Sequence, residues 1–206
     1  MLLAIDTSAG TGVAVVDDDG RVVAERATDD TMRHAEAIGE LLAGALADAG
    51  ATGADVSAVV AGMGPGPFTG LRVGIAAAHA FAFGAGVPVL PVVSHDALAA
   101  EWYAAGGTGP LLVVTDARRR ERYWSAYEGL DADGLPVRVE GPGLAKPDAL
   151  PEAAGTRLDA HRVSAAALGT LAAGMGAAGV PFAADEPLYL RSPDVTPAAA
   201  PKRVSA

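Results

Sequence analysis

The stretch Gly62-Met63-Gly64-Pro65-Gly66-Pro67-Phe68-Thr69-Gly70-Leu71-Arg72-Val73-Gly74 is a glycine- and proline-rich loop between two apolar segments. Residues 56–61 before it predict a buried strand. Apolar residues after it recur at the spacing of a helix, at Leu71, Ile75, Ala78 and Ala82. A strand that turns directly into a helix leaves unpaired N–H groups that favour an anion, and glycines allow close approach of another group. Because the loop has no lysine and does not fit the G-x-x-x-x-G-K-[ST] pattern, it leaves anion binding and tight structural packing equally open.

The composition predicts a protein that folds through packing alone. The 206 residues suffice for one domain or two closely joined lobes, and half of them are hydrophobic. The absence of cysteine excludes disulfides, thiolate metal sites and a cysteine nucleophile. The N-terminus has no basic region and reaches Asp6 after five residues, so we expect no signal peptide and a cytoplasmic protein.

Residues 73–93 are apolar over about the length of a membrane span, with His79 as the single clearly polar side chain. The run is rich in alanine and glycine more than in leucine. Glycines and prolines divide it into a helix and a short strand, at Gly84, Gly86, Pro88 and Pro91. We therefore expect no membrane association.

The formal net charge of −10, from 25 acidic and 15 basic residues, argues against a protein that binds nucleic acid by itself. The one basic cluster, at residues 118–122, lies between two predicted strands. It fits a solvated hairpin end somewhat better than a phosphate-binding site. We expect any nucleic-acid role to be indirect.

The first hundred residues form a coherent unit. Short apolar runs predict three antiparallel strands, at residues 2–5, 12–16 and 21–27. A helix capped by Thr31 and ending near Ala49 follows, and then a strand, a helix from Gly70 and another strand in βαβ order. This order predicts a ribonuclease-H-like layer.

The second half begins in the same way. Three more strands are predicted at residues 111–115, 122–127 and 135–140, and a helix at 164–175. Residues 147–155 read as a loop. We therefore expect an α/β protein of three parts: a first lobe at 1–100, a smaller second lobe at 101–191 and a disordered tail at 192–206.

Five motifs in register give a specific resemblance. They are Asp6-Thr7-Ser8, Arg33-His34-Ala35-Glu36, the glycine loop at 64–74, Asp116-Ala117-Arg118-Arg119 with Tyr123-Trp124, and Pro187-Leu188-Tyr189-Leu190-Arg191. Together they resemble the TsaB (YeaZ) family. The resemblance implies the ASKHA superfamily (actin-like ATPases and sugar kinases), with two ribonuclease-H-like lobes of which the second is reduced.

The resemblance implies a non-catalytic subunit of the bacterial machinery that places a threonylcarbamoyl group on the adenosine beside the tRNA anticodon. Such a subunit dimerises with the catalytic paralogue TsaD, is assisted by the ATPase TsaE, meets tRNA indirectly, and forms a homodimer when alone. The two helices of the first lobe would form the partner interface. The expected contact residues are Met32, Ala35, Leu42, Gly74, Ile75, Ala78 and His79. His79 has an equal alternative as a partly buried, hydrogen-bonded core residue.

The resemblance implies no catalytic residue, metal or cofactor. The catalytic paralogue carries a His-x-x-x-His pair where this chain has His95 and Ala99, so we interpret His95 as a capping or surface residue. A possible vestigial nucleotide site comprises Asp6, Thr7, Ser8 and Asp116, where the superfamily holds its phosphate loops. The alternative for the first of these is a simple Asx or ST turn.

The rival hypothesis is an independent enzyme on the same scaffold, either metallopeptidase-like or a small-molecule kinase. A peptidase would need a metal pair or an activated nucleophile. The four histidines do not show the spacing of metal ligands.

Overall fold

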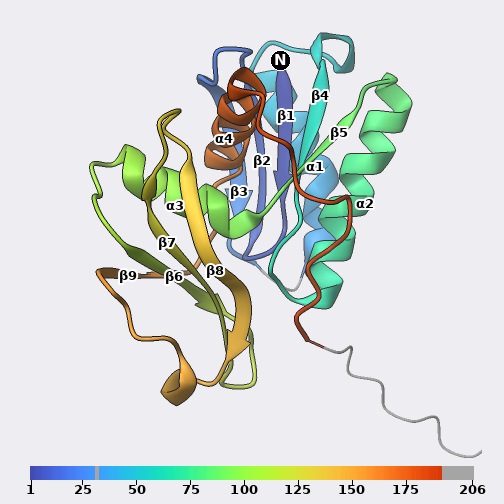
Figure 1. Ribbon diagram of the computed structural model, residues 1–206. Coiled ribbons are helices and arrows are strands. Elements are labelled where there is room, and N and C mark those ends of the chain that lie inside the picture. The colour runs from blue at the N-terminus through green and yellow to red at the C-terminus, as the bar shows by residue number, and fades with distance from the viewer. Residues whose placement is uncertain (31–32, 192–206) are drawn as a thin grey trace, which may run out of the picture.

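The computed structural model describes residues 1–30 and 33–191, which fold into two sheets with helices packed on them (Figure 1). The first sheet has the strand order β3-β2-β1-β4-β5. Its strands are β1 (Leu2–Asp6), β2 (Thr11–Val16), β3 (Val22–Thr28), β4 (Ala58–Gly62) and β5 (Val89–Val92). The first three are antiparallel, whereas β4 runs parallel to β1 and β5 parallel to β4. The predicted ribonuclease-H-like layer is therefore confirmed.

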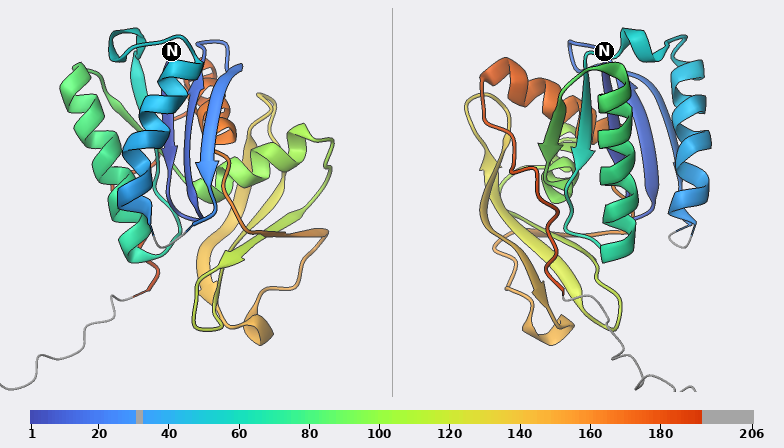
Figure 2. Two further views of the ribbon diagram at one scale, coloured as in Figure 1. Left: turned by 180° about the vertical axis from the view of Figure 1, so that it is seen from behind. Right: turned by 90° about the vertical axis from the view of Figure 1, so that its right-hand side faces the viewer.

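Helices cover both faces of the first sheet (Figure 2). α1 (His34–Asp48) and α2 (Phe68–Ala85) lie on one face, and α4 (Ala165–Ala178) lies on the other. Central strands buried on both faces send alternate side chains to opposite cores. Leu3 and Ile5 belong to the core under α1 and α2, while Leu2 and Ala4 belong to the core shared with α4.

The second sheet repeats the order of the first without its fifth strand, as β8-β7-β6-β9. Its strands are β6 (Leu111–Asp116), β7 (Arg122–Leu130), β8 (Pro136–Ala145) and β9 (Thr156–Ala160). Short 3-10 helices occupy two loops, η1 (Gly53–Asp55) and η2 (Pro147–Ala149). The sequence did not predict β9, because Thr-Arg-Leu-Asp-Ala has one large apolar residue and lies half exposed beside β6. The second lobe is thus reduced, as expected.

α3 (Ser94–Ala104) packs between the second sheet and α4. α4 itself returns to the first sheet and contacts β1 and β2. A Cβ atom on Gly169 would lie 2.6 Å from Cγ2 of Val16, so this glycine lets the helix approach the sheet closely. The assignment of residues 101–191 to the second lobe therefore differs from the packing, since the last helix covers the first sheet.

The segment after α4, residues 179–191, runs along the edge of the first sheet, and we call it the strap. The Leu188 N–H donates to the Met63 carbonyl at 2.8 Å. The Tyr189 ring lies 4.6 Å from the Phe68 ring, and the Arg72 guanidinium lies 3.9 Å above the same phenylalanine. Two motifs far apart in the sequence therefore contact each other directly.

One helix among the described residues, α2, is long and apolar enough by length and composition to cross a membrane. It begins at Phe68, two residues before the predicted start. In the structure it is one layer of the first lobe and packs on β4 and β1. Only 28% of its residues are buried, and its exposed residues include Ala76, Ala80 and Phe83.

Candidate functional site

The Asp6 carboxylate at the end of β1 is enclosed by hydrogen bonds. Its Oδ1 accepts from the Ser8 N–H at 2.8 Å and from the Ser8 hydroxyl at 2.6 Å, and its Oδ2 accepts from the Ser94 hydroxyl at 2.5 Å. Burial raises the pKa of Asp6, and these hydrogen bonds oppose that rise. The bond from the Ser8 N–H closes an Asx turn, so that alternative is confirmed.

Four glycines of the opening stretch pack around this Asp6–Ser8 turn. A Cβ atom added to any of them would lie between 1.9 and 2.8 Å from an atom of the turn. They are Gly62, Gly66, Gly70 and Gly74. The Thr7 hydroxyl donates to the Gly70 carbonyl at 2.7 Å and accepts from the Gly74 N–H at 3.1 Å. The stretch therefore provides close packing for these residues, which is one of the two alternatives that the sequence left open.

A cavity of about 100 Å³ lies between the two lobes above this turn. It is lined by Ser8, Ala9, His34, Pro67, Asp116, Arg118, Ala160 and His161. Ser8 and Asp116 thus share one cavity, as the vestigial-site hypothesis requires, while Asp6 and Thr7 lie buried. Asp116 also forms an ion pair with Arg122. Ligand pockets usually enclose about 300–1,000 Å³, so this cavity is smaller than a usual ligand pocket.

His95 is a core residue, and its interpretation as a capping or surface residue is wrong. The side chain is fully buried, with Nδ1 2.9 Å from the Ser125 hydroxyl and Nε2 2.9 Å from the Thr115 hydroxyl. Burial lowers the pKa of His95 to about 3, so the ring is neutral. It joins α3 to β6 and β7. Within residues 1–30 and 33–191, no three His, Cys, Asp or Glu side chains gather as a metal site.

The predicted partner surface on α2 is partly wrong, because two of its residues lie on the inward face of the helix. Gly74 and Ala78 are buried against the lobe's own sheet, and Ala78 is 0% exposed. They lie on an inner ridge with Ala82, four residues apart, and cannot contact a partner. The outward ridge is Ala76, Ala80 and Gly84, with Phe83 beside it. Phe83, which sequence reasoning did not select, is 91% exposed.

The remaining predicted contacts are placed as follows. Ala35 is exposed on α1, whereas Leu42 and Ile75 are half-buried against the core. The His79 side chain is hydrogen-bonded to a carboxylate oxygen of Asp185 at 3.0 Å, as the alternative for His79 expected, but it is 44% exposed and therefore lies outside the core. Met32 lies outside the described residues.

α1 also has an outward ridge of small residues spaced by four. Its exposed members are Ala35, Gly39, Ala43 and Ala47. Ridges at this spacing interdigitate in the commonest class of helix packing, and small side chains shorten the distance between helices. α1 and α2 contact each other on one face of the sheet, so the two ridges belong to one side of the molecule.

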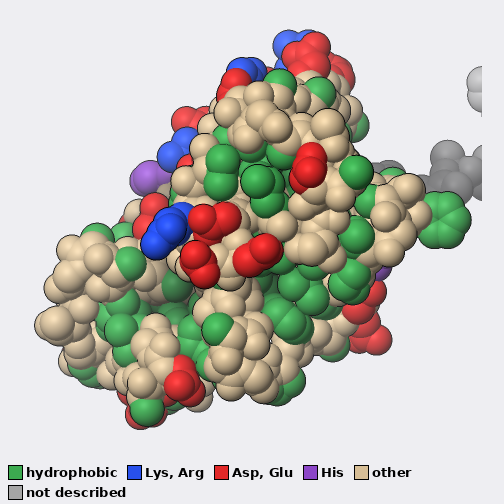
Figure 3. Space-filling view, turned by 90° about the horizontal axis from the view of Figure 1, so that it is seen from above, with side chains coloured by type: hydrophobic (Ala, Val, Ile, Leu, Met, Phe, Trp, Pro, Cys, Tyr) green, Lys and Arg blue, Asp and Glu red, His purple; other side chains and the backbone are tan. Residues whose placement is uncertain are grey.

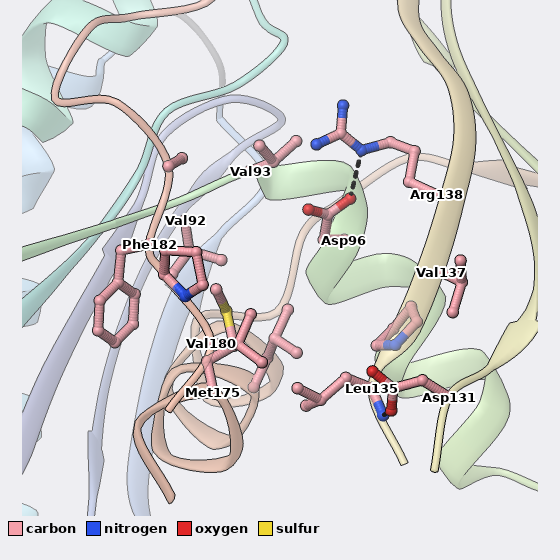
Figure 4. Close-up of a pocket in the computed structure, with 14 residues that line it drawn as sticks. Val92, Val93, Asp96, Asp131, Leu135, Val137, Arg138, Met175, Val180 and Phe182 are labelled. Carbon is pink, nitrogen blue, oxygen red and sulfur yellow. Dashed lines mark hydrogen bonds and ion pairs between the residues drawn. The ribbon is translucent and has the colours of Figure 1, made fainter. Parts of the chain in front are cut away.

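A second cavity of about 380 Å³ separates the segment after α4 from β8 (Figure 4). Met175, Val180 and Phe182 line one side of it, and Leu135 and Val137 line the other. The Asp96–Arg138 ion pair, 3.0 Å long, lies at one end. Burial raises the pKa of Asp96, although the arginine opposes this effect. No sequence motif pointed to this cavity.

The chain matches the family model of TsaD, described as tRNA N6-adenosine threonylcarbamoyltransferase, over residues 21–145. An uncharacterized protein of Mycobacterium tuberculosis (strain H37Rv) is 43% identical, over 96% of this chain and 95% of its own length. The tRNA threonylcarbamoyladenosine biosynthesis protein TsaB of Escherichia coli K12 is 31% identical, over 73% of this chain and 64% of that protein. The structure of YeaZ from Pseudomonas aeruginosa superposes with a TM-score of 0.77 at 28% identity, covering 92% of this chain and 99% of that one.

Proposed function

The chain belongs to the TsaB (YeaZ) family, and on that premise we propose that it is a non-catalytic subunit of the cytoplasmic machinery for tRNA threonylcarbamoyladenosine modification. In this proposal the chain dimerises with the catalytic paralogue TsaD and supports it, TsaE is a further partner, and tRNA reaches the assembled complex. Without TsaD the same surface pairs two copies of the chain.

The outward face of α2 carries this proposal. Phe83 is 91% exposed and stands beside the ridge of Ala76 and Ala80. An isolated exposed aliphatic residue is ordinary, but a large aromatic ring on an apolar helix face is typical of an interaction surface. The neighbouring ridge of α1 extends this face with small residues that admit close helix packing.

The geometry between the lobes supports the non-catalytic part of the proposal. Both oxygens of Asp6 accept hydrogen bonds from within the protein, and the Asp6–Ser8 turn is packed against glycines. The interlobe cavity has about 100 Å³, below the usual size of a ligand pocket. A kinase would need a nucleotide clamp with a free aspartate in a longer cleft.

The test is co-elution with TsaD on size exclusion after the change Phe83→Asp. Burying a phenylalanine contributes about 1.5–3 kcal/mol, so loss of the ring should weaken the complex by about 10- to 150-fold. Val139→Asp is the matched control, because Val139 is 57% exposed and lies on β8 of the other lobe. Both variants should keep the thermal melt of the wild type.

Reconstituted tRNA threonylcarbamoylation, with and without this chain, tests the role itself. Activity that needs the chain and is lost with Phe83→Asp supports the proposal. Unchanged co-elution of the Phe83→Asp variant would refute the interface, and full activity without the chain would refute the role.

A further inference from the structure

A basic groove of about 630 Å³ lies where three distant segments of the chain meet. It is lined by Arg119, Arg120, Glu121, Lys146, Pro147, Asp148 and Arg191. The turn between β6 and β7 and the helix η2 form two of its sides, at the lower end of the second sheet in Figure 1. The third is the end of the strap after α4.

Strand pairing and one hydrogen bond bring these cations together. Arg122 pairs with Ala145 across β7 and β8, which places Lys146 beside the β6–β7 turn. Arg191 Nη1 donates to the carbonyl of Ala117 at 3.3 Å, which fixes the strap to the same turn. The convergence is therefore a product of the fold, and no single sequence motif contains it.

Among the described residues, the lining of the groove has four cations, Arg119, Arg120, Lys146 and Arg191, and two carboxylates, Glu121 and Asp148. Arg191 Nε lies 3.7 Å from Oε2 of Glu121, so the charges of these two side chains offset each other. Arg120 and Lys146 are both exposed, and neither forms an ion pair within the described part of the chain. Asp148 is the remaining acidic side chain of the lining.

The net charge of the chain hides this feature. Residues 1–100 contain 4 basic and 12 acidic side chains, whereas residues 101–191 contain 9 basic and 12 acidic ones. The acidity thus belongs mainly to the first lobe, and acidic groups are prominent on the face seen in Figure 3. At physiological ionic strength, charges are screened beyond about 8 Å, so the groove acts on a ligand locally.

The backbone of the turn is unusual for arginine. Arg118, Arg119 and Arg120 have φ values of 61°, 49° and 63°, in the left-handed region that glycine or asparagine adopts more easily. Each such residue costs about 1–2 kcal/mol. Arg119 and Arg120 line the groove, and arginine at positions where glycine would relieve strain indicates a function for these two side chains.

We propose that the basic groove binds the phosphate backbone of RNA, which in the proposed function is the tRNA that the machinery modifies. This inference rests on that function. The lining fits an RNA backbone, because its described cations outnumber its carboxylates, and the phosphates of RNA are neutralised by such cations. Nucleic-acid interfaces are polar and basic.

The test is the salt dependence of tRNA binding, measured by fluorescence anisotropy from 50 to 200 mM salt. The double variant Arg120→Gln, Lys146→Gln removes two cations from the groove. The control Arg21→Gln, Arg157→Gln changes the net charge equally at exposed arginines outside it. Each titration uses the isolated chain and, separately, its complex with TsaD.

The groove variant should bind tRNA about tenfold more weakly at low salt, and its log–log salt slope should be shallower by about 1.4–1.8, while the control keeps wild-type values. Equal slopes for the groove variant and wild type would overturn the proposal, and so would equal losses in both variants. Loss of TsaE binding with tRNA binding intact would assign the groove to an acidic protein and overturn it too. If the wild type fails to co-elute with TsaD, the proposed function is refuted instead. The titration of the isolated chain then still shows whether the groove binds tRNA.

Discussion

The buried, neutral His95 predicts a specific loss of stability in acid. In the unfolded chain a histidine has a pKa near 6.5, whereas burial lowers the pKa of His95 to about 3 in the folded protein. Between these two values the unfolded chain binds a proton that the native protein does not. Stability should therefore be fully present above pH 6.5 and fall as the pH falls toward 3.

The magnitude follows from the width of that window. Each pH unit inside it costs about 1.4 kcal/mol, so the approach from pH 6.5 to pH 4.5 should cost about 2.7 kcal/mol. The variant His95→Gln cannot titrate at this position. The difference in unfolding free energy between wild type and variant should thus shift by about that amount, against the wild type, between pH 7.5 and pH 4.5.

The assay is urea unfolding followed by circular dichroism, with both proteins at both pH values. The other titrating groups contribute equally to the pH dependence of stability in both proteins, so their contributions cancel in the comparison. Asp6 and Asp96 are among these, because burial raises the pKa of each and therefore favours the folded state as the pH falls. A parallel loss of stability in wild type and variant would show that His95 titrates like an exposed histidine, and would refute the buried hydrogen bonds to Thr115 and Ser125.

Two further pairs of variants test the packing of α2. Ala78→Asp should lower the free energy of unfolding by several kcal/mol, because Ala78 is 0% exposed, whereas Ala80→Asp should leave the thermal melt nearly unchanged and weaken TsaD co-elution. Equal melts for the two would contradict the assigned rotation of the helix. Gly74→Ala should destabilise by about 1–3 kcal/mol through its clash with the Thr7 hydroxyl, whereas Gly84→Ala, with open space around it, should stabilise by up to about 1 kcal/mol. Chemical denaturation measures both, and a neutral Gly74→Ala would argue against the glycine packing.

Much of the fold could be predicted because its signals are local. The apolar runs that become β1, β4 and β6 are contiguous in the sequence, and their order with the intervening helix patterns predicts the ribonuclease-H-like layer. The resemblance to the TsaB family likewise rests on residues that stand in order along the chain. β9 was missed, since a half-exposed edge strand with one large apolar residue has almost no periodic signal.

The candidate sites depended on contacts that no local pattern contains. The sequence showed that α2 is apolar, but alanine and glycine on every side of it could not show whether Ala78 or Ala80 faces the sheet. The sequence placed His95 beside Ser94, but the burial of His95 comes from the packing of α3 on the second sheet, where hydroxyls of β6 and β7 hydrogen-bond to its ring.

By itself, the sequence determined the strand and helix order of the first lobe, the resemblance to the family, and the run of glycines between β4 and α2. Only the tertiary structure decided what those glycines do, because the Asp6–Ser8 turn that they enclose is more than fifty residues away along the chain. The same holds for the basic groove, whose cations come from three separate segments. Side-chain chemistry and local periodicity can be read from the sequence. Packing against the whole sheet determines which face of an alanine- and glycine-rich helix such as α2 turns inward.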